Sequence, residues 1–73
     1  MKKDRKERRL SPELSNRVID ALGGNTVVGN IFRIGPQAIS HWRRMGIPEF
    51  RLDYLRLAYK KLDVMQEPEI KKF

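Results

Sequence analysis

Apolar residues recur along this chain at helical spacing, in groups separated by glycine or proline. The first group predicts an amphipathic helix that starts at Ser11, whose hydroxyl can cap it, and stops at Gly23 and Gly24. Pro12 suits the first turn, because the N–H that it lacks would have no helical partner there. The apolar stripe of this helix is Leu14, Val18, Ile19 and Leu22.

Residues 25–48 predict two more short helices, over 26–32 and 36–45, that meet at a tight turn. We expect Asn25 or Thr26 to cap the first of them. Gly29 would let a neighbouring helix approach closely. The residues predicted to face the interior are Val28, Phe32, Ile34, Ile39 and Trp42, and Gly46 is predicted to end the second helix.

A fourth helix is predicted over residues 49–62, with one stripe formed by Leu52, Leu55, Tyr59 and Leu62. A second apolar group on this helix is Phe50, Tyr54 and Leu57. A core this small cannot cover both groups, so part of the second is expected on the surface. This group would either form a homodimer contact through helix 49–62 or fold over the first helix in a monomer.

The sequence therefore predicts an all-α fold, a compact four- to five-helix domain with flexible charged termini. Residues 1–10 are read as a basic disordered arm, residues 11–62 as the domain and residues 63–73 as a tail. The arm would either bind phosphate groups of the partner or only keep the chain soluble. In the tail, Ile70 and Phe73 could dock on a partner.

Charge and composition narrow the classes of function. The net charge of +7 favours nucleic acid or another anionic surface as partner. The chain has no cysteine and one histidine, so neither a disulfide nor a tetrahedral metal site is expected. Neither a membrane span nor a signal peptide is evident, which favours a cytoplasmic location. We expect no enzyme activity, catalytic residue, cofactor or small-molecule ligand, because the sequence has no phosphate-binding glycine loop or nucleophile–base arrangement.

The outer side of the predicted helix 36–45 is polar and carries Gln37, Ser40, His41 and Arg44, with Arg43 at its flank. Residues 25–48 contain three arginines and neither aspartate nor glutamate. A pair of helices that lacks acidic residues, in a basic protein, is suited to meeting phosphate.

The segment resembles the helix-turn-helix of the phage Cro and repressor families, and is most similar to the small all-helical Cro type and the related YdaS-like regulators. The run AISHWRRMGIP, residues 38–48, is similar to their recognition helix and its exit turn. A short activator family of lambda-like phages shares this run. The resemblance covers residues 18–60 and departs at Arg33, where the family usually has glycine with positive φ. Either the turn is rebuilt there, or the arginine tolerates the strain because it reaches a phosphate.

The resemblance implies that helix 36–45 reads the major groove of a double-stranded DNA operator. The predicted base contacts are Gln37, Ser40, His41 and Arg44, with Gln37 suited to adenine and Arg44 to guanine. The predicted contacts to the DNA backbone are Asn25, Thr26, Arg33, Pro36 and Arg43. The expected function is that of a phage or prophage Cro-type repressor. A lambda-like activator and an antitoxin-like protein-interaction module are the alternatives.

Overall fold

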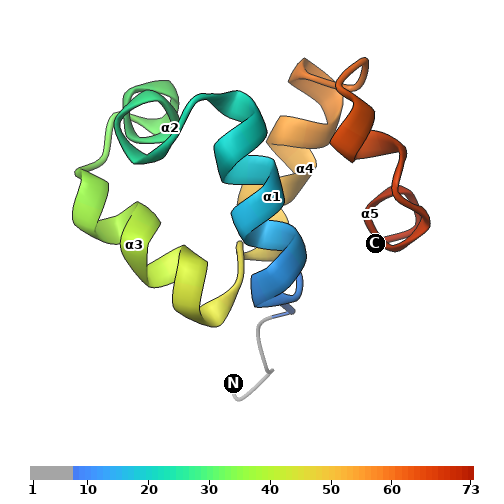
Figure 1. The fold of residues 1–73 in the computed structure, drawn as a ribbon, viewed down its shortest axis with the longest axis horizontal. Helices are drawn as coiled ribbons and strands as arrows, with labels where there is room; N and C mark the ends of the chain where they lie inside the picture. The colour runs from blue at the N-terminus through green and yellow to red at the C-terminus, as the bar shows by residue number, and fades with distance from the viewer. Residues whose placement is uncertain (1–7) are drawn as a thin grey trace, which may run out of the picture.

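Five α-helices and one 3-10 helix follow one another along residues 8–73, the part of the chain that the computed structural model describes (Figure 1). Their bounds are α1 Pro12–Leu22, α2 Asn25–Phe32, α3 Pro36–Met45, α4 Glu49–Ala58, η1 Asp63–Gln66 and α5 Pro68–Lys71. These residues form no strand, so the predicted all-α class is confirmed. None of the helices in this part of the chain combines the length and the apolar character that crossing a membrane requires.

Helix α1 lies at the centre of the fold and packs against α2, α3 and η1. In Figure 1, α2 and α3 lie on its left and the C-terminal segment on its right, with α4 behind. The stripe predicted for α1 supplies three fully or nearly buried residues, and Leu22 packs at the edge of the core. The buried apolar residues are Leu10, Leu14, Val18, Ile19, Val28, Ile39, Trp42, Ile47, Leu52, Leu55, Val64, Met65 and Ile70.

The helix starts agree with the sequence analysis at α1 and differ at α2. The Ser11 hydroxyl accepts a hydrogen bond from the Leu14 N–H at 3.2 Å, as predicted for an N-cap. The N-cap of α2 is Gly24, and no side chain caps that helix, so the expectation for Asn25 or Thr26 was wrong. Asn25 is already the first helical residue, and its amide is bonded across to α3 instead.

The described end of the predicted arm is part of the fold. The Leu10 N–H donates to the Ile47 carbonyl at 3.0 Å, and the Glu49 N–H donates to the Arg8 carbonyl at 2.9 Å. Leu10 is 2% exposed, so the arm prediction is wrong for residues 8–10. For residues 1–7 it falls outside the described residues. A side chain at Gly46 would overlap the Leu10 carbonyl, so this junction needs glycine.

Helix α4 is shorter than predicted, and the C-terminal segment differs from the predicted tail. The helix ends at Ala58, and the chain reverses through a turn at residues 59–62. This reversal brings η1 and α5 onto the core, where Val64, Met65 and Ile70 are buried. The turn contains neither glycine nor proline. Burial of the three apolar side chains therefore outweighs the local preference of residues 59–62 to continue a helix.

Ser15 is a buried polar residue that joins α1 to the segment between α3 and α4. Its hydroxyl accepts from the Ile47 N–H at 2.8 Å and donates to the Leu10 carbonyl at 3.4 Å. The side chain is fully buried, so no water replaces these bonds. Ser15 thereby connects α1, residue 10 and the segment between α3 and α4.

We expect Ser15→Ala to lower the free energy of unfolding by about 1–3 kcal/mol, because the Ile47 N–H would be left buried without an acceptor. Alanine has the higher helix propensity, so a serine without a structural role would give a slight gain on replacement. Denaturant unfolding followed by circular dichroism measures the difference. A variant as stable as the unchanged protein would contradict the role given to Ser15.

Candidate nucleic-acid interface

The outward side of α3 presents three polar side chains that have no partner within the protein. Gln37, His41 and Arg44 are exposed, and their spacing of four and three residues places them in one line along the helix. None of them makes a hydrogen bond or an ion pair among residues 8–73. On the opposite side of α3, Ile39 is 0% and Trp42 6% exposed, so the helix is fixed by its inner side.

Arg43 holds α3 to the two preceding helices. Its Nε donates to Asn25 Oδ1 of α2 at 2.7 Å, and its two terminal nitrogens donate to Asn16 Oδ1 at 2.6 Å and Asp20 Oδ1 at 2.8 Å of α1. Asn16 also donates from Nδ2 to the Arg43 carbonyl at 3.0 Å. Asn25 donates from Nδ2 to Ser40 Oγ at 2.9 Å. We call this set the Arg43 clamp: Arg43, Asn16, Asp20, Asn25 and Ser40.

The clamp changes the interpretation of two predicted contacts to the DNA backbone. All three guanidinium nitrogens of Arg43 and both amide atoms of Asn25 are bonded within the protein, and only 27% of the Arg43 side chain is exposed. A guanidinium that binds three partners in its own plane serves to fix geometry. The structure therefore assigns Arg43 and Asn25 a structural role beneath the exposed line of α3.

Ser40 belongs to the flank of α3 and not to its exposed line. It is half-buried, and its oxygen already accepts the Asn25 amide. Of the four predicted base contacts, the structure thus brings three together on the surface and sets the fourth at the edge of the clamp.

The turn between α2 and α3 is closed by a left-handed arginine. Arg33 has φ 58° and ψ 43°, and its backbone N–H donates to the Asn30 and Gly29 carbonyls at the end of α2. The turn is therefore not rebuilt, and the arginine accepts a conformation that favours glycine. Its side chain is exposed and has no polar partner among the described residues.

Gly29 permits the turn itself to close. The Ile34 N–H donates to the Gly29 carbonyl at 2.9 Å, and a Cβ at Gly29 would stand 2.7 Å from the Ile34 carbonyl oxygen. The expected close approach is thus made by the backbone of the turn and not by a neighbouring helix. Ile34, which was predicted to face the interior, is partly buried and packs against the core.

The N-termini of α2 and α3 add to the positive character of this surface. Thr26 and Pro36 lie in these first turns and are exposed. No side chain caps either helix, so N–H groups of the first turn remain available to an anion. Arg33 and Arg44 are also exposed on these two helices and their turn. Residues 25–48 contain no acidic side chain that would offset this positive charge.

The sequence analysis missed Asn16 and Asp20, on which the clamp depends. They lie four residues apart on α1 and so share one side of that helix. This spacing predicts a polar side but does not indicate which distant residue it meets, since Arg43 is 23 residues or more away in the sequence.

Comparison of the chain with protein-family models, with curated proteins and with solved structures gave no match. The arrangement of side chains on α3 and in the clamp is therefore the basis for the functional argument.

We expect Arg43→Ala and Arg43→Lys each to lower the free energy of unfolding by about 1–3 kcal/mol, because lysine keeps the charge but cannot bridge three acceptors in one plane. Arg44→Ala, its exposed neighbour, is the matched control and should change stability by less than about 0.5 kcal/mol. Chemical denaturation of the three variants gives the comparison. Full stability in Arg43→Lys would show that charge alone matters at this position.

We expect Arg33→Gly to raise the free energy of unfolding by roughly 1 kcal/mol, because glycine adopts the left-handed conformation without the steric cost that a Cβ brings. Arg33→Ala keeps the Cβ and is the matched control, so it should show no such gain. Thermal unfolding of both variants would decide the matter. A destabilised Arg33→Gly would mean that the side chain holds the turn in a way that its exposure does not suggest.

Proposed function

We propose that this protein is a sequence-specific DNA-binding transcriptional regulator of the Cro type, with α2 and α3 acting as a helix-turn-helix. In this proposal α3 enters the major groove of double-stranded DNA, and the protein represses transcription in the cytoplasm of a bacterial or phage-infected cell. The observation that carries it is the line Gln37, His41 and Arg44, which is exposed and unpartnered along a helix anchored from behind.

The chemistry of this line suits the edges of base pairs. A glutamine amide can donate to and accept from adenine N6 and N7, and an arginine can donate twice to guanine O6 and N7. Gln37 lies in the first turn of α3, the part of a recognition helix that goes deepest into the groove. His41 lies one turn later, and Arg44 would read a base or grip the phosphate at the far end.

The phosphate contacts proposed here differ from the first expectation. Thr26 and Pro36 lie at the open N-termini of α2 and α3, where N–H groups can bind a phosphate oxygen. Arg33 projects from the turn between these helices and can accompany them. Arg43 and Asn25 support α3 from within the clamp and are not assigned to phosphate.

A regulator of this kind would occupy a two-fold operator as a homodimer. Two copies of α3 would then lie about 34 Å apart, one turn of the DNA helix. A lambda-like activator would use the same α3 and would also contact RNA polymerase, so α3 alone does not give the sign of regulation.

A second candidate function rests on a different observation. Phe50, Tyr54 and Leu57 are 61%, 52% and 78% exposed on α4, which is the arrangement that a protein-interaction module would present. An antitoxin-like module of this kind would bind its partner through α4 and would not depend on α3.

We expect Gln37→Ala to weaken binding to a DNA site selected from a random pool by roughly 5- to 150-fold, and to leave binding to a scrambled site almost unchanged. Arg33→Gly should weaken both equally and reduce the slope of log affinity against log salt by about 1. Fluorescence anisotropy titrations at several salt concentrations measure both effects.

Lys61→Ala is the control for general charge, because Lys61 is exposed in the turn after α4, away from the α3 surface. Equal losses on both DNAs in Gln37→Ala would leave only non-specific binding. A protein that enriches no sequence and binds neither DNA at low salt would overturn the proposal.

A further inference from the structure

The outward side of α4 is apolar although the inward side of the same helix is already buried in the core. Phe50, Tyr54 and Leu57 follow at spacings of four and three and form one stripe, which we call the α4 stripe. Leu52 and Leu55 on the other side are 0% exposed. The α4 stripe does not fold over α1, as one of the two expectations had it, because all three side chains are more than half exposed.

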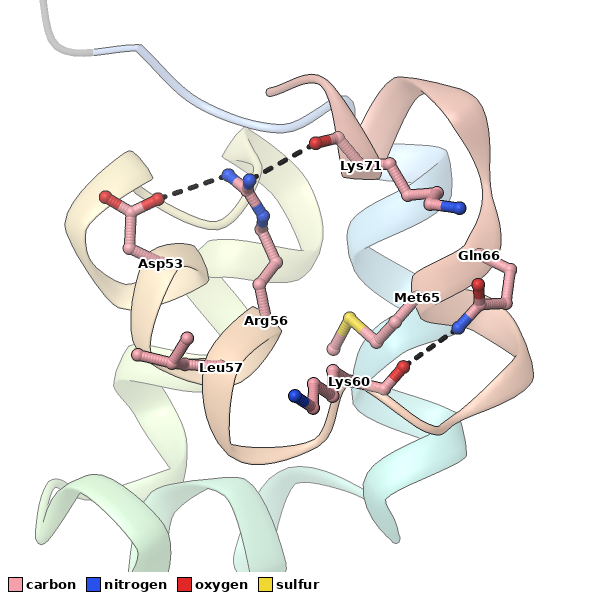
Figure 2. Close-up of a pocket in the computed structure, with 7 residues that line it drawn as sticks. All are labelled: Asp53, Arg56, Leu57, Lys60, Met65, Gln66 and Lys71. Carbon is pink, nitrogen blue, oxygen red and sulfur yellow. Dashed lines mark hydrogen bonds and ion pairs between the residues drawn. The ribbon is translucent and has the colours of Figure 1, made fainter.

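A line of charged residues runs beside the α4 stripe, and its signs are segregated. Within α4 its members are Glu49, Asp53 and Arg56, spaced by four and three residues, and Lys60 follows in the turn after the helix ends at Ala58. The acids stand in the first half of α4, and the bases stand at its end and in the turn that follows. Figure 2 shows Asp53, Arg56 and Lys60 around a groove of about 560 Å³ that Leu57 also lines.

The charges of this line are only partly satisfied within one copy. Asp53 and Arg56 form an ion pair at 3.3 Å with 60% and 31% of their side chains exposed, and Arg56 also donates to the Lys71 carbonyl at 3.2 Å. Glu49 meets Arg8 at 3.4 Å on a surface where both side chains are substantially exposed. Lys60 has no acidic partner among residues 8–73. Exposed pairs of this kind contribute little and can exchange partners at low cost.

We propose that two copies of this chain pair through α4 in antiparallel orientation, about a two-fold axis next to Tyr54. In such an interface, if residue i meets residue j, then j also meets i. Phe50 then lies opposite the partner's Leu57, and Tyr54 opposite the partner's Tyr54. The same register places Asp53 opposite the partner's Arg56, and Glu49 near the end of the partner's α4, which the turn with Lys60 follows.

The apolar and the charged residues thus select the same axis, although they lie on different lines of the helix. In an antiparallel pair, the edge of α4 that carries Glu49, Asp53 and Arg56 meets its own copy in reverse order, so the acidic first half of one helix faces the basic end of the other. A different protein as partner would need only one sign of charge on this chain, whereas α4 carries acids in its first half and bases at its end. A second copy is therefore the occupant that the pattern fits.

The area of the stripe indicates a weak pairing. With about 200 Å² for a whole aromatic side chain, the exposed parts of the stripe amount to on the order of 350 Å² per copy. Two copies then reach roughly 700 Å², below the 1,200 Å² or so of a standard interface, so flanking residues must contribute. We expect a dissociation constant on the order of tens of micromolar, at which a shared operator would reinforce the dimer.

This inference deepens the proposed occupancy of an operator by a dimer, but pairing is measured without DNA, so the two proposals can fail separately. Sedimentation equilibrium of the protein alone should show a reversible monomer–dimer equilibrium in the micromolar range. Leu57→Glu should abolish it, because a charge would enter the apolar contact with the partner's Phe50 at two symmetric places. A chain that stays monomeric at millimolar concentration would overturn the pairing and leave the DNA proposal standing.

The register is tested by exchanging charges. Asp53→Lys and Arg56→Glu should each weaken self-association about ten-fold or more, because each variant brings like charges together at two symmetric places. A mixture of the two variants should associate as strongly as the unchanged protein, because every facing pair is then of opposite sign.

Glu69→Lys is the matched control for Asp53→Lys, since it changes the net charge equally and lines a different groove, beside Leu10 and Ser11. It should leave association unchanged. Equal weakening by Glu69→Lys, or a mixture that associates no better than its components, would overturn the antiparallel register. Circular dichroism melting curves confirm that each variant is folded before it is compared.

Discussion

The orientation of α3 depends on the hydrogen bonds that the planar guanidinium of Arg43 makes to α1 and α2. Apolar contacts through Ile39 and Trp42 hold α3 against the core, but the hydrophobic effect is not directional and does not by itself fix rotation about the helix axis. Three hydrogen bonds in one plane, to α1 and to α2, remove this freedom. The direction in which Gln37, His41 and Arg44 point is therefore set from the inner side of the same helix.

Both ends of α3 are fixed by backbone as well. At its start, the hydrogen bond between Gly29 and Ile34 closes the preceding turn, and the absence of a side chain at Gly29 makes this approach feasible. At its end, Ser15 ties the residue after Gly46 to α1. A helix held at both ends and along one side loses little conformational entropy when it meets a ligand, which is how preorganisation raises affinity.

The sequence predicted the features that depend on neighbouring residues, and it missed those that depend on contacts with residues far away along the chain. The cap at Ser11 and the burial of Trp42 follow from residue type and spacing, whereas the strain at Arg33 was one of two alternatives that the family resemblance left open. Arg43 was read as a phosphate contact because charge shows only that a partner must be polar, and its partners on α1 come from far along the chain. Val64, Met65 and Ile70 are too few and too irregular to show a helical period, so the segment resembled a tail.

The two candidate surfaces are joined by an aromatic contact. The Phe32 ring of α2 meets Trp42 of α3 edge-on at 5.6 Å between centroids, and Tyr54 of α4 at 5.5 Å. The Arg51 guanidinium lies over the same Phe32 ring at 5.0 Å. Tyr54 is thus both the centre of the α4 stripe and a support of the residue that packs under α3. If pairing restrains Tyr54 and thereby raises the affinity of α3 for DNA, linkage requires that DNA binding favour the pairing to the same extent.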